Sequence, residues 1–244
     1  MAEYSTDIYT EADSEPEALA NLGPLGPLAG HWASVIGADD HPVGPGSDAD
    51  AEAVAAGTEH NVFVERYDLD LIDPQTNGPQ LFYGLRYHVH IVKPGEVETF
   101  HDQVGYWLWE PAERRVTQTI AIPRGQVLLA AGFAEPDATE FEVTAELGAR
   151  TFGILSNPFL DVAFRTLRFR MHVTVNADRT WSYDQDTVMQ LPDRDAPFHH
   201  IDRNTLTRVG EPMPNPLVQA RATPATGSGG LAIGNLRNEK GNLL

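Results

Sequence analysis

The sequence predicts an all-β protein, an antiparallel up-and-down β-barrel of about ten strands. Three observations predict it. Apolar and polar residues alternate along several segments, turn-forming residues separate these segments, and no convincing helical window lies between them. Parallel strands need a long crossover connection, so consecutive strands are expected to pair antiparallel. A meander of this many strands usually closes, because closure removes the exposed edges.

Four segments show the alternation most clearly. In residues 81–92 the odd positions are apolar, from Leu81 to Ile91, whereas the even positions include Arg86, His88 and His90. Each such segment is expected to be a strand with one face toward a core and the other toward solvent. The other three are 141–145, 167–175 and 181–189, and turns are expected at 73–79, 93–95, 110–111, 136–137 and 176–178.

The composition divides the chain into a barrel domain and two tails. Residues 1–20 are expected to be an acidic disordered tail, residues 21–209 the β-barrel domain, and residues 210–244 a flexible tail rich in Pro and Gly. Residues 38–58 are rich in Asp, Gly and Ala and predict a long acidic loop with a helical turn at 49–56. Residues 24–30 predict a short turn that plugs one end of the barrel.

Charge limits the classes of partner. The chain has 35 acidic and 17 basic residues, a net charge of -18, and no Lys or Arg precedes Arg66. Such a surface repels phosphate backbones and anionic lipids, so we expect neither nucleic-acid nor membrane binding. No apolar segment is long enough to cross a bilayer, and the N-terminus lacks the pattern of a secretion signal, so a cytoplasmic protein is expected. An exposed barrel strand would allow a homodimer.

Several kinds of catalytic site lack their usual residues. The chain contains no Cys, which excludes disulfides, iron–sulfur clusters, Cys-based zinc sites and covalent haem attachment. Phosphate-binding loops, dinucleotide fingerprints, nucleophile elbows and H-E-x-x-H motifs are also absent.

The nine histidines are the main candidates for chemistry. His88, His90 and His172 lie at polar positions of alternating segments and are expected to face solvent. His101 and the pair His199–His200 are instead embedded among aromatic and aliphatic residues. Each is therefore either a hydrogen-bonded core residue or part of a cavity wall.

Three motifs resemble the nitrobindin family, the haem-binding β-barrels related to fatty-acid-binding proteins. The first is residues 22–32, L-G-P-L-G-P-L-A-G-H-W, which is similar to the family's opening segment. The second is residues 100–107, F-H-D-Q-V-G-Y-W. The third is residues 200–208, H-I-D-R-N-T-L-T-R, which resembles the closing segment, where a histidine precedes the last strand. Two glycines that usually follow the first motif are replaced by Ser34 and Ile36, whose side chains are expected to take up space in the pocket.

The resemblance implies a lipocalin-like barrel that holds haem b near its mouth through one histidine, binds nitric oxide and isomerises peroxynitrite to nitrate at ferric iron. It implies His200 as the iron ligand, with His199 as the competitor because neighbouring strand residues point to opposite faces. His101 would be the catalytic residue and would donate a hydrogen bond to the bound ligand. The remaining expected haem contacts are the wall residues Trp32 and Met189, and Arg86, paired with a propionate.

Two alternatives remain open. A lipocalin-like barrel could carry an apolar small molecule without haem, using the aromatic stretch 106–109. The barrel could also serve as an interaction module, with the acidic N-terminus as its contact arm.

Overall fold

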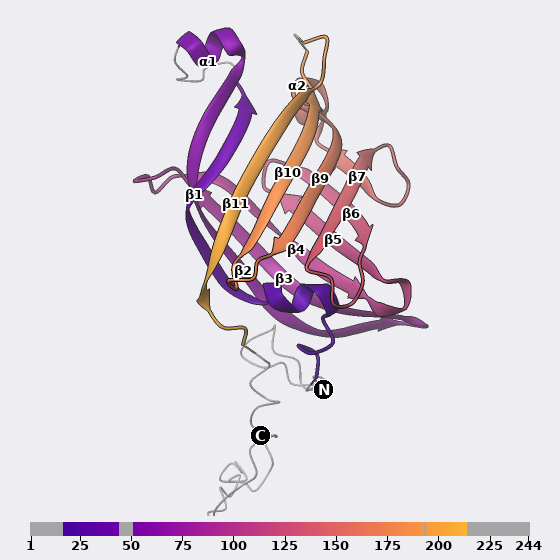
Figure 1. Cartoon of the computed structure of the whole chain (residues 1–244). Helices are drawn as coiled ribbons and strands as arrows, with labels where there is room; N and C mark the ends of the chain where they lie inside the picture. Colours follow the sequence, from indigo (N-terminus) through magenta and orange to yellow (C-terminus); the bar gives the residue numbers. More distant parts are fainter. Residues whose placement is uncertain (1–16, 44–50, 193, 214–244) are drawn as a thin grey trace, which may run out of the picture.

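The computed structural model describes residues 17–43, 51–192 and 194–213. Eleven strands form a closed barrel, and both described ends of the chain lie near the same end of it (Figure 1). The expected barrel of about ten strands is confirmed. The strands are β1 (Gly30–Pro42), β2 (Thr58–Asn77), β3 (Gln80–Val92), β4 (Thr99–Glu110), β5 (Arg115–Ile122), β6 (Gln126–Phe133), β7 (Glu140–Leu147), β8 (Gly153–Ser156), β9 (Arg165–Val175), β10 (Trp181–Gln190) and β11 (Phe198–Gly210).

Neighbouring strands follow the chain order around the barrel, with one exception. The short strand β8 lies between β6 and β7, antiparallel to β6 and parallel to β7. Strands β6 and β7 pair directly only at Ala131 and Thr144. This seam is therefore the part of the wall with the fewest direct ladder contacts. All four segments expected as strands are confirmed, as β3, β7, β9 and β10.

Two expected loops are partly strand. Asp73-Pro74 is not a turn: it lies within β2, where the register shifts between Ile72 and Gln75, and a bulge tolerates proline because a ladder hydrogen bond is already lost. The hairpin turns at Gly78, whose φ of +61° suits glycine. The acidic segment 38–58 is likewise not all loop, because residues 38–42 continue β1.

A short helix of the acidic segment lies on a projecting hairpin. The helical turn expected at 49–56 is confirmed as α1 (Ala51–Ala56), which caps the β1–β2 hairpin beyond the rest of the barrel (Figure 1). Residues 44–50 lie outside the described residues. So do residues 1–16 and 214–244, on which most of the expected tails and the proposed contact arm fall. Within the described ranges, no helix is long and apolar enough to span a bilayer.

The expected plug closes one end of the barrel. It is the 3₁₀-helix η1 (Gly23–Leu28), and its Leu25 and Leu28 are fully buried. The Trp32 indole donates a hydrogen bond to the Leu28 carbonyl at 2.7 Å. Trp32 also contacts Trp181 edge to face, with ring centroids 6.2 Å apart. These apolar contacts make this end a packed core.

A bulge in β1 determines which residues face the interior near the opposite end. Ser34 pairs with Glu65 and Gly37 with Phe63, so β1 advances by three residues between these two pairs while β2 advances by two. Side chains alternate along a strand, so the extra residue shifts the inward positions of β1 from even to odd numbers. Asp39 and His41 consequently face inward, and Asp39 is only 2% exposed. Gly37 is required here, because a Cβ would lie 2.2 Å from the Phe63 ring.

Candidate functional site

A cavity of about 770 Å³ fills the barrel at the end opposite η1. Its mouth is bordered by the ends of several strands and by α2 (Pro158–Ala163). Apolar side chains form much of the wall, among them Phe63, Ile91, Ile122, Phe164, Phe169 and Met189. A hollow of this size, lined by apolar side chains together with polar and charged groups, is suited to binding a small molecule.

Three titratable side chains meet on one wall. Asp39 comes from β1, and His200 and Asp202 come from β11; we call them the Asp39–His200–Asp202 cluster. The Nε2 atom of His200 lies 2.7 Å from Asp39 Oδ1 and 3.7 Å from Asp202 Oδ1. Residues 200 and 202 share a face of β11 because they are two positions apart. The β1 bulge turns Asp39 toward them.

Neighbouring side chains hold the outer oxygens of both carboxylates. The Nδ1 atom of His41 lies 2.6 Å from Asp39 Oδ2. Gln185 Nε2 donates to Asp202 Oδ2 at 2.9 Å. Each carboxylate therefore has one oxygen held by a neighbouring side chain, His41 or Gln185, and the other turned toward His200.

The cluster separates the pKa values of its members. Burial by itself would raise the pKa of Asp39, but hydrogen bonds from His200 and His41 outweigh it and hold this pKa well below its ordinary value. Burial raises the pKa of Asp202 to about 6, although the His200 charge opposes it. Burial would lower the pKa of His200, but the charges of Asp202 and Asp39 raise it to about 8. His200 is therefore mostly cationic near neutral pH.

A buried acid lies deeper in the barrel. Glu65 of β2 is 1% exposed and accepts hydrogen bonds from the Tyr183 hydroxyl at 2.9 Å and from Asn204 Nδ2 at 2.6 Å. Burial raises its pKa to about 7 against these hydrogen bonds. Near neutral pH both the charged and the neutral form of the Glu65 carboxyl group are therefore populated.

His101 faces the cavity from β4 in a different environment. Burial lowers its pKa below the ordinary value, so its ring is neutral near pH 7. A chain of hydrogen bonds fixes the tautomer: Tyr87 donates to the Thr119 carbonyl at 2.9 Å, and Gln103 Nε2 donates to the Tyr87 oxygen at 3.1 Å. Gln103 Oε1 then faces His101 Nε2 at 3.2 Å and accepts a hydrogen bond from its N–H. The neutral ring is left with Nδ1, an acceptor.

Of the residues expected from the sequence, the cavity brings together His101, His200 and Met189. Trp32 lies elsewhere, in the packed end beside η1, with Arg208 stacked 4.3 Å from its ring centroid. His199 points to the outer face, where its Nδ1 lies 2.9 Å from an Asp186 oxygen and its side chain is 59% exposed. The alternation of β11 therefore selects His200 over His199 for the cavity.

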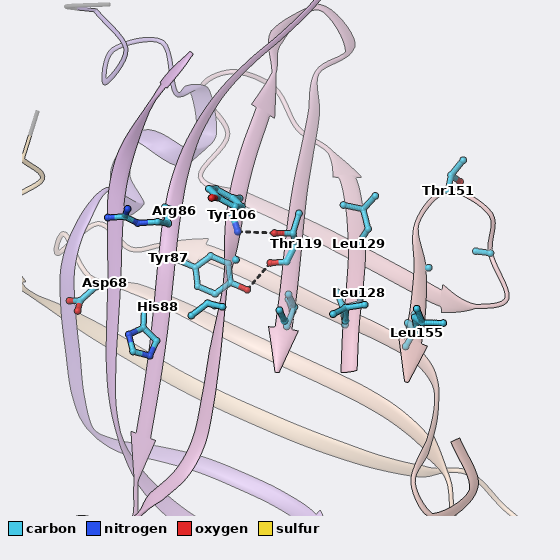
Figure 2. Close-up of a pocket in the computed structure, with 18 of the residues that line it drawn as sticks. Asp68, Arg86, Tyr87, His88, Tyr106, Thr119, Leu128, Leu129, Thr151 and Leu155 are labelled. Atoms are coloured by element: carbon cyan, nitrogen blue, oxygen red, sulfur yellow. Dashed lines mark hydrogen bonds between the residues drawn. The ribbon is translucent and has the colours of Figure 1, made fainter. Parts of the chain in front are cut away.

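Arg86 also lies outside the cavity. It points from β3 into a groove of about 1050 Å³ on the outer face, near Asp68, His88 and Tyr106 (Figure 2). Its Nη2 donates to Asp70 at 3.2 Å. Because even positions of β3 face outward, Arg86 does not reach a ligand inside the barrel. Lys93 and Arg124 are instead the described Lys and Arg residues that line the cavity.

The residues that replace the family's glycines do not crowd the pocket. Ile36 is 74% exposed, and Ser34 donates a hydrogen bond to Asn204 Oδ1 at 2.6 Å. Neither lines the cavity. The expectation that they fill ligand space is therefore wrong, because the bulge turns Ile36 outward.

Sequence reasoning missed Asp39, Glu65 and the role of Asp202. For Asp202 a signal was available, since residues 198, 200, 202, 204 and 206 alternate from Phe198 to Leu206 on one face of a strand. Glu65 occupies the inward position between Phe63 and Tyr67 in the same way. Asp39 could not be found by alternation, because the bulge reverses it.

Comparisons with known proteins agree with the fold. Residues 21–208 match the family described as "THAP4-like, heme-binding beta-barrel domain". The chain belongs to this family. The crystal structure of Rv2717c from M. tuberculosis aligns with a TM-score of 0.50 and 19% sequence identity, covering 80% of this chain and 99% of that one; at this identity the likeness concerns the fold. No protein of curated function matches the sequence.

The cavity residues fit a haem. Apolar side chains form much of the wall, which suits a porphyrin face, and His101 and His200 bring imidazoles to it from two different strands. Lys93 and Arg124 place cations at the mouth, where carboxylate side groups would be paired. The main obstacle is local, because the Nε2 atom of His200 already contacts Asp39.

Proposed function

We propose that this barrel binds haem b in the cavity and that His200 is its axial ligand. Membership of a haem-binding family supports haem as the ligand, and the absence of Cys favours the non-covalent b type. The observation that carries the residue assignment is the direction of the β11 side chains, since His200 faces the apolar cavity and His199 faces outward. Lys93 and Arg124 are the proposed partners of the propionates.

The finer proposal concerns reactive nitrogen species. When bound, a ferric haem supplies a Lewis-acidic iron with one open position, which suits nitric oxide and, by family resemblance, the isomerisation of peroxynitrite to nitrate. The chain itself supplies an imidazole, an apolar wall that excludes water, and His101 beside the ligand space. Because Gln103 engages the Nε2 proton of neutral His101, we revise its expected role from hydrogen-bond donor to proton acceptor at Nδ1.

Hemin titration of the purified full chain tests the haem proposal. The wild type is expected to develop a Soret band at a stoichiometry near one, and His200→Ala is expected to lose it. His199→Ala is the matched control, since it removes the neighbouring imidazole from the outer face and should load like the wild type. A Soret band that survives in His200→Ala and disappears in His101→Ala would move the axial ligand to β4. If the wild type forms no band, the haem proposal fails.

The reactivity is tested separately on loaded protein. Nitric oxide should shift the Soret band reversibly, and stopped-flow mixing with peroxynitrite should give faster decay and more nitrate than free buffer. His101→Ala should load with haem normally and slow the peroxynitrite reaction. An unchanged rate in this variant would remove His101 from the catalytic role.

The second candidate is a carrier of an apolar small molecule without haem. The observation that favours it is the ion contact at His200, which holds the ring in its cationic form, whereas an iron ligand must be neutral. Native mass spectrometry of the protein purified without added hemin distinguishes the two. A co-purified lipid-like molecule with no iron supports the carrier, and a mass increase that matches haem excludes it.

A further inference from the structure

We propose that Asp39, His200 and Asp202 form a second kind of site in the same cavity, which binds a divalent first-row transition-metal cation when haem is absent. The proposal rests on the proposed function in one respect, because the cation and the haem iron would compete for His200. The cluster is unlike a solvated group of surface acids: Asp39 is 2% exposed, Asp202 is 17% exposed, and all three side chains line a cavity.

The geometry is close to that of a three-ligand site. One ligand atom from each side chain lies within 4.8 Å of the other two. The two distances from His200 Nε2, 2.7 Å to Asp39 and 3.7 Å to Asp202, bracket the separation of about 3 to 3.5 Å expected between ligands that each lie about 2.1 Å from one metal ion. Small side-chain rotations would therefore place a cation among the three atoms.

The surrounding side chains orient the two carboxylates as outer ligands of metal sites do. His41 holds Asp39 Oδ2, and Gln185 holds Asp202 Oδ2, so each carboxylate turns its other oxygen toward His200. Such outer contacts fix ligand direction before the metal arrives. The cavity supplies the entry path and room for water in the remaining coordination positions.

The donor atoms select the class of cation. One imidazole nitrogen and two carboxylate oxygens suit Zn²⁺, Mn²⁺ or Fe²⁺. Mg²⁺ and Ca²⁺ prefer all-oxygen sites, and Cu⁺ prefers sulfur ligands, which the cluster lacks. A divalent cation among the three ligand atoms would also offset the charges of the two carboxylates that meet on this wall.

Calorimetric titration of the haem-free full chain with zinc chloride, and separately with manganese chloride, tests the site. The wild type should bind one cation. Asp202→Asn should weaken binding at least tenfold, because it replaces a charged ligand while keeping the side-chain shape. The matched control is Asp102→Asn, which removes the carboxylate from another His–Asp pair, 2.8 Å from His88 on the outer face, and should bind like the wild type. Equal affinity in Asp202→Asn and the wild type would overturn the proposal.

Competition with hemin separates this inference from the proposed function. Zn²⁺ at a concentration that just saturates the wild type should weaken the apparent hemin affinity of the wild type more than that of Asp202→Asn. If the wild type binds Zn²⁺ but never forms a Soret band, the haem proposal fails and the cation site stands. If hemin binds and Zn²⁺ does not, the reverse holds. Tight Zn²⁺ binding that leaves hemin affinity unchanged would overturn the shared use of His200.

Discussion

The two ends of the barrel use the same strands for opposite purposes. At the closed end the inward positions of β1 and β11 carry Trp32 and Leu206, both buried in the apolar core. At the open end the inward positions of the same two strands carry Asp39, His200 and Asp202. A strand therefore changes from packing to ligand chemistry within a few residues, and each end can be altered with limited effect on the other.

The largest effect is expected from the closed end. Leu25→Ala removes a fully buried side chain from η1 and should lower the free energy of unfolding by about 2–5 kcal/mol, because it leaves a cavity in a packed core. Urea unfolding measures it. Leu155→Ala, at a position 70% exposed, is the control and should stay within about 0.5 kcal/mol of the wild type. Hemin and Zn²⁺ affinities of folded Leu25→Ala should match the wild type; a large loss of either would show that the ends are coupled.

A pH-dependent effect is expected from Glu65. Its pKa is about 7 in the folded protein and ordinarily 4.5, so the folded state holds a proton that the unfolded chain releases between these values. This contribution to stability is complete below pH 4.5 and is lost as the pH rises through 7, a loss of about 3 kcal/mol. Glu65→Gln should remove it. Denaturant midpoints of wild type and variant from pH 4 to 8 measure the difference; parallel curves would contradict the raised pKa.

A smaller effect on stability is expected from deleting Ile36. The deletion removes the extra residue of the β1 bulge and makes the alternation of β1 continuous, which leaves Asp39 paired with Asn61 and facing inward. Because Ile36 itself is exposed, the cost should be about 1–3 kcal/mol. Calorimetry should therefore show Zn²⁺ binding by the deletion variant, as by Ile36→Ala, which keeps the chain length. Loss of Zn²⁺ binding in the deletion variant alone would mean that the bulge positions Asp39 by more than its inward direction.

The smallest effect is expected from Arg86→Ala. Its ion pair with Asp70 is partly exposed on the outer face, so its loss should cost about 1 kcal/mol or less. Hemin affinity should be unchanged in a Soret titration. A tenfold weaker affinity would restore Arg86 as a haem contact.

The sequence predicts the barrel because alternation is a local property, and β3, β9 and β10 alternate over most of their length, although a register shift between Thr166 and Arg168 interrupts β9. It predicts less of the site. Alternation requires that only one of His199 and His200 face inward, and the resemblance, not alternation, favours His200. The resemblance also implies Arg86 as a haem contact, against the outward parity of its own strand. The inward direction of Asp39 depends on a bulge that no turn-forming residue marks in the sequence. Strand β8 is too short to show the alternation of apolar and polar residues. The raised pKa of Glu65 results from burial, which the hydrogen bond from Asn204 opposes; both exist only in the folded barrel, since Asn204 is distant in sequence.

The seam between β6 and β7 has a consequence for how the barrel moves. Only one residue pair joins these strands directly, and the four-residue β8 bridges the rest, so few backbone hydrogen bonds need to break for the wall to part there. Amide protons along β6 and β8 should exchange with deuterated solvent sooner than those of β2 and β3, which share a long ladder. The barrel can thus loosen along one side while its tryptophan-packed end stays folded.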